Sequence, residues 1–151
     1  MINQLNAFTS FSRLAENLLE QTRTELSLQS LEFCTSGLDQ PEYPAMWLWE
    51  MGDEEGENEG CTLVQLSLKY NNWQEWDSRR VRQLFLNKLG FSHRAVYMRS
   101  FFNVFNEFED EPEKRVGKMR VEPVGGQLWQ RVNEPDPTLI HDRLRLKIFY
   151  D

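Results

Sequence analysis

The hydrophobic pattern changes its period once between Cys61 and Gly90, and this change predicts a strand followed by a helix. In the first part every second position is apolar, as in a half-buried strand: Val64, Leu66, Leu68 and Tyr70. After Asn71-Asn72, apolar residues recur at helical spacing and fall on one side of a helix: Val81, Leu84, Phe85 and Leu89. Asp77 or Ser78 is the expected N-cap of this helix, and Gly90 is its expected left-handed C-cap.

Two further segments have a clear period, one near each end of the chain. Near the N-terminus, steps of three and four residues predict an amphipathic helix of about four turns: Leu5, Phe8, Phe11, Leu14, Ala15, Leu18 and Leu19. Its rival N-caps are Asn6, Thr9 and Ser10. Near the C-terminus, Asp142–Tyr150 alternates regularly and predicts a strand with one apolar and one basic face. We expect the basic face to be solvated or to meet an acidic partner.

The remaining segments predict less regular strands. Leu26–Phe33 has a period of two with one slip, which fits a bulged strand or two short strands. Ala45–Met51 carries apolar bulk on both faces, so we expect it to be buried on both sides or to cover a partner. The acidic, glycine-rich segment Gly52–Gly60 is the expected hairpin loop between this strand and the one starting at Cys61. Ala95–Phe108 fits a helix or a strand, and its aromatic and β-branched residues favour a strand.

Turn residues organise the rest of the chain into a single predicted domain. Gly125-Gly126 separates two short runs and predicts a tight hairpin turn between them. Prolines mark loops at Gly37–Pro44 and Glu134–Thr138. No repeat or flexible linker divides residues 1–151, so we expect one domain. The predicted fold class is α+β, a mostly antiparallel sheet of about five to seven strands with two amphipathic helices packed on one face.

The composition is typical of a soluble globular protein, with 27% charged and 13% aromatic residues among 151. No apolar run approaches the roughly 20 residues of a membrane helix, and the N-terminal residues do not resemble a secretory signal. We therefore expect no membrane association and a cytoplasmic protein, or a particle assembled in the cytoplasm. Cys34 and Cys61 are far apart, so we interpret them as small core residues rather than a disulfide.

The net charge of -7 argues against a nucleic-acid binder, because binding to phosphates needs a positive surface. A DNA mimic is also disfavoured. Its negative charge should follow a duplex-like path, whereas the acids here are concentrated in Glu50–Glu59 and Glu107–Glu113.

Few residues are arranged for catalysis or metal binding. The only two histidines, His93 and His141, have no spacing that suits zinc. His141-Asp142 is an HD dipeptide, but metal-dependent phosphohydrolases with that pair need further histidines and acids. Nucleophile-elbow, nucleotide-loop and EF-hand patterns are missing from the sequence. We therefore expect a protein that is not an enzyme and has no cofactor or metal.

Large aromatic and basic residues are the candidates for subunit contacts. Five tryptophans exceed what a domain with two helices and one sheet buries comfortably, and surplus aromatics are typical of interfaces. The alternative is that all five lie in the core and at its rim. The acidic segment Gly52–Gly60 and the basic side chains are candidates for opposed patches. The interface candidates are Trp47, Trp49, Trp73, Trp76, Arg79, Arg80, Arg82, Trp129, Arg143, Arg145 and Lys147.

Four segments occur in a characteristic order: an amphipathic N-terminal helix, PEYPAMWLW, LVQLSLKYNNWQEWDSRRVRQLFLNKLG and DRLRLKIFY. This order resembles the tail terminator, or tail-completion, proteins of tailed bacteriophages. The resemblance covers most of the chain as a pattern, while Ala95–Glu134 is longer and more aromatic than the family pattern. It implies a homo-oligomeric ring, expected to be a hexamer, that caps the tail tube, stops its polymerisation and joins it to head or neck proteins. The implied location is the virion tail or neck, assembled in the host cytoplasm.

Two other classes of protein fit the same sequence. One is a different assembly protein of a phage neck or baseplate. The other is a monomeric acidic binding or inhibitor domain that uses Gly52–Gly60 against a basic partner. The mass in solution separates a monomer from an assembly, and electron microscopy separates the two kinds of assembly.

Overall fold

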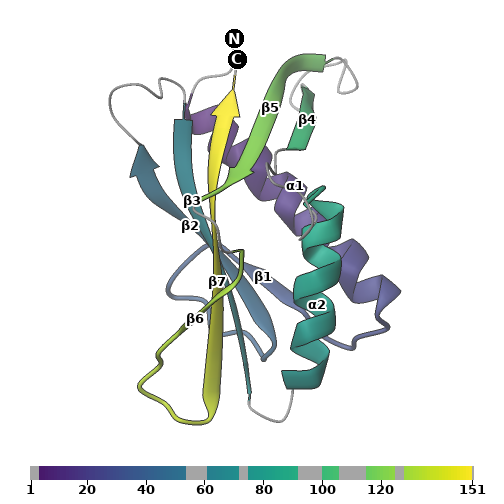
Figure 1. The fold of residues 1–151 in the computed structure, drawn as a ribbon, viewed down its shortest axis with the longest axis vertical. Helices are drawn as coiled ribbons and strands as arrows, with labels where there is room; N and C mark the ends of the chain where they lie inside the picture. The colour runs from purple at the N-terminus through teal and green to yellow at the C-terminus, as the bar shows by residue number, and fades with distance from the viewer. Residues whose placement is uncertain are drawn as a thin grey trace.

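A computed structural model describes residues 4–53, 61–71, 75–91, 100–105, 115–124 and 128–150 (Figure 1). The elements in chain order are α1 (Gln4–Glu25), β1 (Glu32–Cys34), β2 (Ala45–Asp53), β3 (Cys61–Asn71), α2 (Glu75–Lys88), β4 (Ser100–Phe105), β5 (Arg115–Pro123), β6 (Gln130–Val132) and β7 (Leu139–Tyr150). The strands form one sheet in the order β1-β2-β3-β7-β5-β4, and β6 also pairs with β7. All these pairs are antiparallel except β1 with β2.

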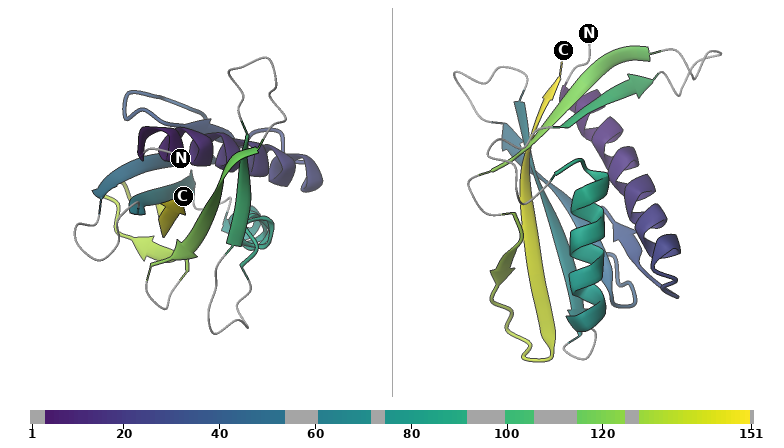
Figure 2. Two further views of the ribbon diagram at one scale, coloured as in Figure 1. Left: turned by 90° about the horizontal axis from the view of Figure 1, so that it is seen from above. Right: turned by 45° about the vertical axis from the view of Figure 1, so that its right-hand side comes forward.

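The sheet curls into a half-barrel, and both helices pack on the same face of it (Figure 2). Every second residue of the strands faces the core and forms one wall of it, because successive side chains of a strand point to opposite faces. From β3 and β7 that wall contains Val64, Leu66, Leu68, Tyr70, Leu144, Leu146 and Ile148, all 0% exposed. The helices supply the opposite wall with Phe11, Ala15, Leu18, Leu19, Val81, Phe85 and Leu89. The predicted α+β fold with two helices on one face is confirmed.

Both helices end in a left-handed cap, and one of these caps corrects a prediction. Gly90 has a φ of 84°, and the Phe91 amide donates to the Leu86 carbonyl, so the predicted C-cap is confirmed. At the end of α1 the left-handed residue is Ser27, and the Leu28 amide donates to the Arg23 carbonyl. The strand predicted from Leu26 is therefore wrong at its start. Leu26 and Leu28 lie at the end of a helix, and within Leu26–Phe33 the strand begins only at Glu32.

Both helices also begin before the N-caps that the sequence predicts. α1 begins at Gln4, before all three expected caps, and α2 begins at Glu75, which places Asp77 and Ser78 in its first turn. The strand favoured within Ala95–Phe108 is confirmed for Ser100–Phe105, and its flanks lie outside the described residues.

The hairpin predicted around Gly125-Gly126 is wrong. β5 and β6 do not pair with each other, and instead occupy successive parts of one edge of β7. Met119–Pro123 pairs with the last half of β7, and Gln130–Val132 pairs with its first half. β7 has 12 residues, so one strand edge has room for both partners. Residues 125–127 themselves lie outside the described ranges, as does 54–60 of the predicted acidic loop between β2 and β3.

Candidate functional site

The side chains of Arg143, Arg145 and Lys147 form a cationic row on the outer face of the sheet, opposite the helices. They alternate along β7 with core residues, so the strand geometry directs them away from the core. All three are partly exposed. β3 flanks the whole row on one side, where Gln65 is the register partner of Arg145. On the other side β6 flanks Arg143 through Gln130, and β5 flanks Lys147 through Glu122. The row therefore stands on the middle of the sheet, where the backbone is held by strands on both sides.

Neutral amides hold the two guanidinium groups of this row. Arg143 Nη2 donates to Gln130 Oε1 at 3.3 Å, and Arg145 Nε donates to Gln65 Oε1 at 3.0 Å. Gln65 is itself fixed, because its Nε2 donates to Ser67 Oγ at 2.9 Å. Within the described part of the chain neither guanidinium takes part in an ion pair. The two charges are thus positioned without being neutralised by any carboxylate of the described residues.

The other basic candidates are arranged differently. Arg79 and Arg80 are exposed on α2, and Arg80 Nη1 lies 3.8 Å from Asp77 Oδ1. Arg82 turns inward, where its Nε lies 3.6 Å from Asp142 Oδ2. The structure therefore does not bring Arg82 together with Arg79 and Arg80 as one surface patch.

The chain itself covers the aromatic candidates of β2. Trp47 lies on the outer face yet is only 6% exposed, and its Nε1 donates to the Ser36 carbonyl at 3.2 Å. The Tyr43 ring centroid lies 6.4 Å from that of Trp47, and partly buried Trp49 packs in the same small cluster. The segment between β1 and β2 thus folds over these rings, and the cluster also contains the buried Cys34 thiol. Burial raises the pKa of this thiol, with smaller contributions from nearby acids.

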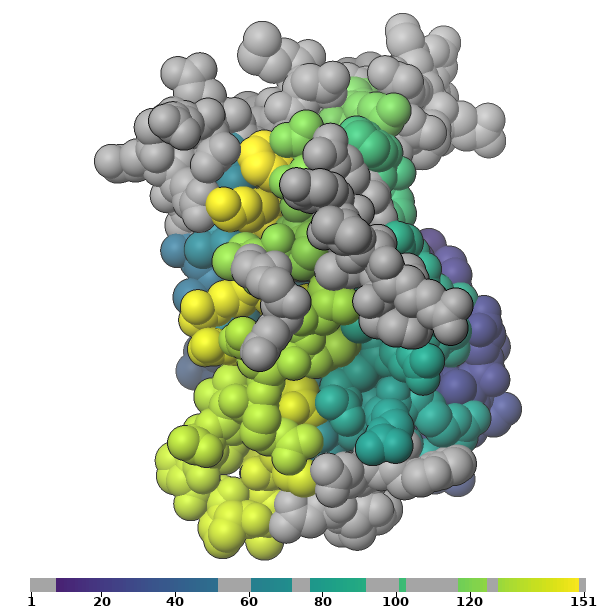
Figure 3. Space-filling model, viewed as in Figure 1, coloured from purple at the N-terminus to yellow at the C-terminus, as the bar shows by residue number. Residues whose placement is uncertain are grey.

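Trp129 also has an internal role. It is partly buried against the core, and its Nε1 donates to the Arg82 carbonyl of α2 at 3.2 Å. Figure 3 shows the chain around β6 lying against α2 in this region. Trp73 and the side chain of Trp76 lie outside what the structure describes. The three described tryptophans therefore all contribute to packing within the subunit.

A buried polar cluster joins β3, β6, β7 and α2, and our sequence reasoning missed it. Asp142 is 2% exposed; it accepts a hydrogen bond from the Tyr70 hydroxyl and another from Arg131 Nε at 2.9 Å. Arg82 approaches the same carboxylate, and the Ser78 side chain hydrogen-bonds to Tyr70. Burial raises the pKa of Tyr70, and the hydrogen bond to Asp142 raises it further. The available signal was that Asp142 shares the strand face of Leu144 and Leu146.

His141 belongs to a separate group on the opposite face of β7. Its Nδ1 lies 3.0 Å from Glu134 Oε1, and Lys69 Nζ lies 3.5 Å from the same oxygen. Burial lowers the pKa of His141, and nearby Lys69 lowers it further, whereas Glu134 opposes the shift. The two residues of the HD dipeptide therefore point to different faces of the sheet. Among the described residues, no group of three or more His, Cys, Asp or Glu side chains is placed to hold a metal ion.

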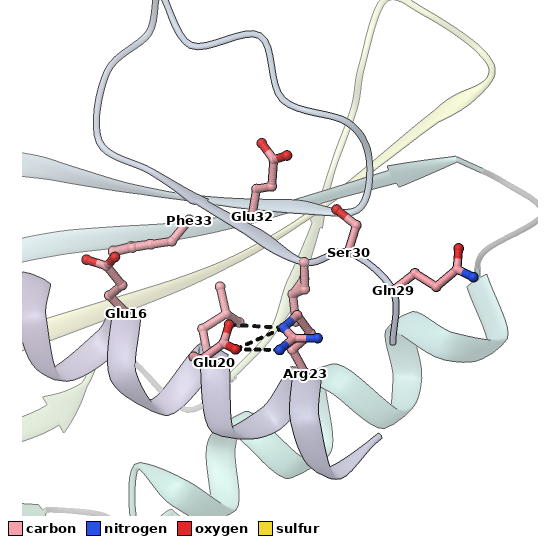
Figure 4. A pocket seen from close by; sticks show the side chains of 9 residues that line it. Glu16, Glu20, Arg23, Gln29, Ser30, Glu32 and Phe33 are labelled. Carbon is pink, nitrogen blue, oxygen red and sulfur yellow. Dashed lines mark hydrogen bonds and ion pairs between the residues drawn. The ribbon is translucent and has the colours of Figure 1, made fainter. Parts of the chain in front are cut away.

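A groove of about 690 Å³ lies between α1 and β1 (Figure 4). Three carboxylates line it, Glu16 and Glu20 from α1 and Glu32 from β1, together with Arg23. Arg23 Nε donates to Glu20 Oε2 at 3.0 Å, and this contact lowers the pKa of Glu20. The apolar side chains beside them are Leu19, Leu31 and Phe33. The groove thus combines an acidic rim, an apolar lining and the edge of a strand.

Comparison with known proteins gives no family for this chain: no family model matches it, and no curated protein matches it. Within the described residues, no helix is long and apolar enough to cross a membrane.

Proposed function

We propose that this protein is a structural assembly subunit of a bacteriophage tail, and that copies of it form a ring that caps the tail tube and joins it to the neck. The order of sequence segments supports this family assignment. The observation that carries an assembly role is the cationic row. Arg143 and Arg145 are held in place by neutral amides on a rigid part of the sheet, with no ion pair to a described carboxylate.

Such a row suits a partner surface rich in carboxylates. A guanidinium that is already positioned loses less side-chain entropy when a carboxylate binds, and a charge with no intramolecular counter-ion gains more from the partner. The outer face therefore docks onto an acidic surface of the assembled tail. The ring forms in the host cytoplasm and stays in the virion, at the junction of tail and neck.

The experiment uses the purified full chain together with the tail-tube protein encoded in the same genome. Light scattering and electron microscopy should reveal a closed ring, and the ring should shorten the tubes when present during their polymerisation. Arg143→Gln/Arg145→Gln should lose tube binding by at least tenfold and keep the ring mass. Arg79→Gln/Arg80→Gln is the matched control, because it removes the same charge from the exposed face of α2.

Four results would change this assignment. A monomer at all concentrations excludes the ring and favours the acidic binding domain. A ring without any effect on tubes favours another neck or baseplate protein. If the two double variants bind tubes equally well, the outer face is not the docking surface. If Arg143→Gln/Arg145→Gln changes the ring mass, the row lies at a subunit boundary instead.

A further inference from the structure

The two terminal strands of the sheet differ in what lies beside them. Within the described residues β1 pairs only with β2, and β4 pairs only with β5. On β4, Phe101 is 52% exposed, and Lys118 of β5 places its Nζ 4.8 Å from the centroid of that ring. Beside β1, the groove of about 690 Å³ follows the chain from Gln29 to Phe33. β1 therefore has room for an additional extended chain next to it.

The backbone of β1 has hydrogen-bonding groups on the side away from β2. The two strands are parallel, and the Glu32 amide donates to the Pro44 carbonyl of the neighbouring chain at 3.4 Å. Since the backbone groups of successive strand residues point to opposite edges, those of Phe33 point away from β2. Among the described residues, the Phe33 amide and carbonyl have no hydrogen-bond partner. A terminal strand in this state can accept an incoming strand through main-chain hydrogen bonds.

Carboxylates dominate the charge of the groove. Glu16 and Glu20 of α1 and Glu32 of β1 line it together with one guanidinium, that of Arg23, which is paired with Glu20. Glu16 and Glu32 are exposed and form no ion pair with any residue in the described ranges. Figure 4 shows Glu32 pointing away from the helix, whereas Glu16 lines the helix side of the groove. A strand added beside β1 would therefore meet a carboxylate on each of its two faces.

These features together define the kind of chain that fits the groove. We propose that β1 accepts an extended segment of a partner protein, rich in lysine and arginine, which adds as a strand along its free edge. The backbone of this segment pairs with Phe33, and its basic side chains meet Glu16 on the helix side and Glu32 on the other. Apolar side chains on the helix side cover Leu19. Charge favours such a segment over a second copy, because two copies joined through β1 would bring two acidic grooves together.

This inference goes beyond the proposed ring and does not depend on it. The cationic row lies on β7 in the middle of the sheet, whereas the groove lies beside β1 at one end of the sheet. One subunit can therefore hold an acidic partner on its outer face and a basic segment at its edge at the same time.

A basic peptide tests the charge preference with the full chain. The probe is Lys-Val-Lys-Lys-Lys-Val-Lys with fluorescein at its N-terminus and an amide at its C-terminus, so that both valines and the central lysine can face the helix. Fluorescence anisotropy at low salt should show saturable binding, and Glu16→Gln/Glu32→Gln should weaken it about tenfold. Glu42→Gln/Glu50→Gln is the matched control, because these two carboxylates are also exposed but do not line the groove. This control should weaken binding by less than about twofold.

Backbone methylation separates strand pairing from simple charge attraction. N-methyl groups on alternate residues remove the amide donors from one edge of the probe and leave its charge unchanged. Of two probes methylated on the odd or on the even residues, one should bind about tenfold more weakly and the other should bind like the parent peptide. Hydrogen exchange measured by NMR should slow at the Phe33 amide when the parent peptide binds, and should stay unchanged at the Glu32 amide, which already donates to Pro44.

Each outcome decides for or against strand addition. If Glu16→Gln/Glu32→Gln binds the probe no more weakly than the control variant, the groove does not select the basic segment and the proposal is wrong. If both methylated probes bind like the parent peptide, charge alone attracts the peptide and no strand is added. If the Phe33 amide is protected in the protein alone and the mass rises with concentration, a second copy occupies the edge instead. The comparison of the two methylated probes uses the wild type, so it stands even where circular dichroism shows that a variant has lost its fold. A monomer that binds the probe as expected supports this inference and removes only the ring.

Discussion

Removal of one hydroxyl from the buried polar cluster should destabilise the fold measurably. Tyr70→Phe keeps the ring, which is fully buried, and deletes only the hydroxyl. This hydroxyl donates a hydrogen bond to Asp142 and accepts one from Arg131 Nη2 at 3.3 Å. A hydrogen bond to a charged acceptor contributes about 1.5–3 kcal/mol. Asp142 is 2% exposed, so water cannot readily replace the lost donor. We therefore expect the free energy of unfolding to fall by about 1.5–3 kcal/mol.

Urea unfolding followed by tryptophan fluorescence measures this change. With an m-value of about 2 kcal/mol per molar urea, the midpoint should fall by about 0.7–1.5 M without a change in m. Burial and Asp142 raise the pKa of Tyr70, so the phenol stays neutral and the effect should be the same from pH 7 to pH 9. All variants are compared at one protein concentration, because assembly adds to apparent stability.

Two comparisons isolate the cluster from a general effect of losing a hydroxyl. Tyr43→Phe is the matched control, because Tyr43 is only partly buried and should lose less than half as much stability. A double-mutant cycle of Tyr70→Phe with Asp142→Asn should give a coupling energy of at least about 0.5 kcal/mol, since the residues are in direct contact. A loss below about 0.5 kcal/mol in Tyr70→Phe, or no coupling, would show that this charged hydrogen bond does not stabilise the fold.

Two further predictions concern the helix caps and the pH dependence of stability. Gly90→Ala should lower the melting temperature by about 2–6 °C, because a side chain at a φ of 84° costs about 1–2 kcal/mol. Ser27→Gly should raise the melting temperature, because Ser27 has a φ of 54° and glycine adopts that angle at less cost. If thermal melts show shifts of the same sign for both variants, the cap assignment is wrong. His141 has a lowered pKa in the fold, so the unfolded chain binds the proton first, and stability that is fully present above pH 6.5 should be lost as the pH falls below that value. His141→Gln should flatten the dependence of the urea midpoint between pH 7 and pH 5, and an unchanged slope would contradict this cause.

The parts of the fold that the sequence predicted well are those where local pattern and tertiary contacts agree. Val64–Tyr70 alternates because one face meets the helices, and Gly90 ends α2 because only glycine adopts its backbone angles at little cost. The pairing of β2 with β3 followed from their adjacency in the chain. In each case the information lies within a few residues.

The wrong predictions come from signals that have two structural meanings. Leu26 and Leu28 are spaced like a strand, but a left-handed cap at Ser27 produces the same alternation at the end of a helix. Gly125-Gly126 separates two runs in the sequence, and composition alone does not tell whether those runs pair with each other or both pair with one edge of a third strand. That distinction depends on β7, which follows later in the chain.

The sequence predicted the charges of the candidate site but not the side-chain contacts that hold them. The alternation of Asp142–Tyr150 predicted a basic face, and the row lies on the outer face of β7. Nothing in the sequence placed Gln65 and Gln130 beside these arginines, because the contacts join β3 and β6 through β7. The buried cluster likewise depends on Tyr70 and Asp142, which are 72 positions apart.

The covered tryptophans change the physical argument for assembly. The surplus of aromatic residues in the sequence predicts an interface, yet Trp47, Trp49 and Trp129 pack within their own subunit. What the described surface offers a partner is instead charge, at the cationic row, the acidic groove and Lys118, with Phe101 as its exposed aromatic ring. Charged contacts weaken as salt shortens the screening length from about 10 Å at 0.1 M to about 3 Å at 1 M, whereas buried apolar contacts do not. An assembly built on these surfaces therefore belongs to the salt-sensitive kind, in which charge selects the partner and the open strand edges supply the remaining contacts.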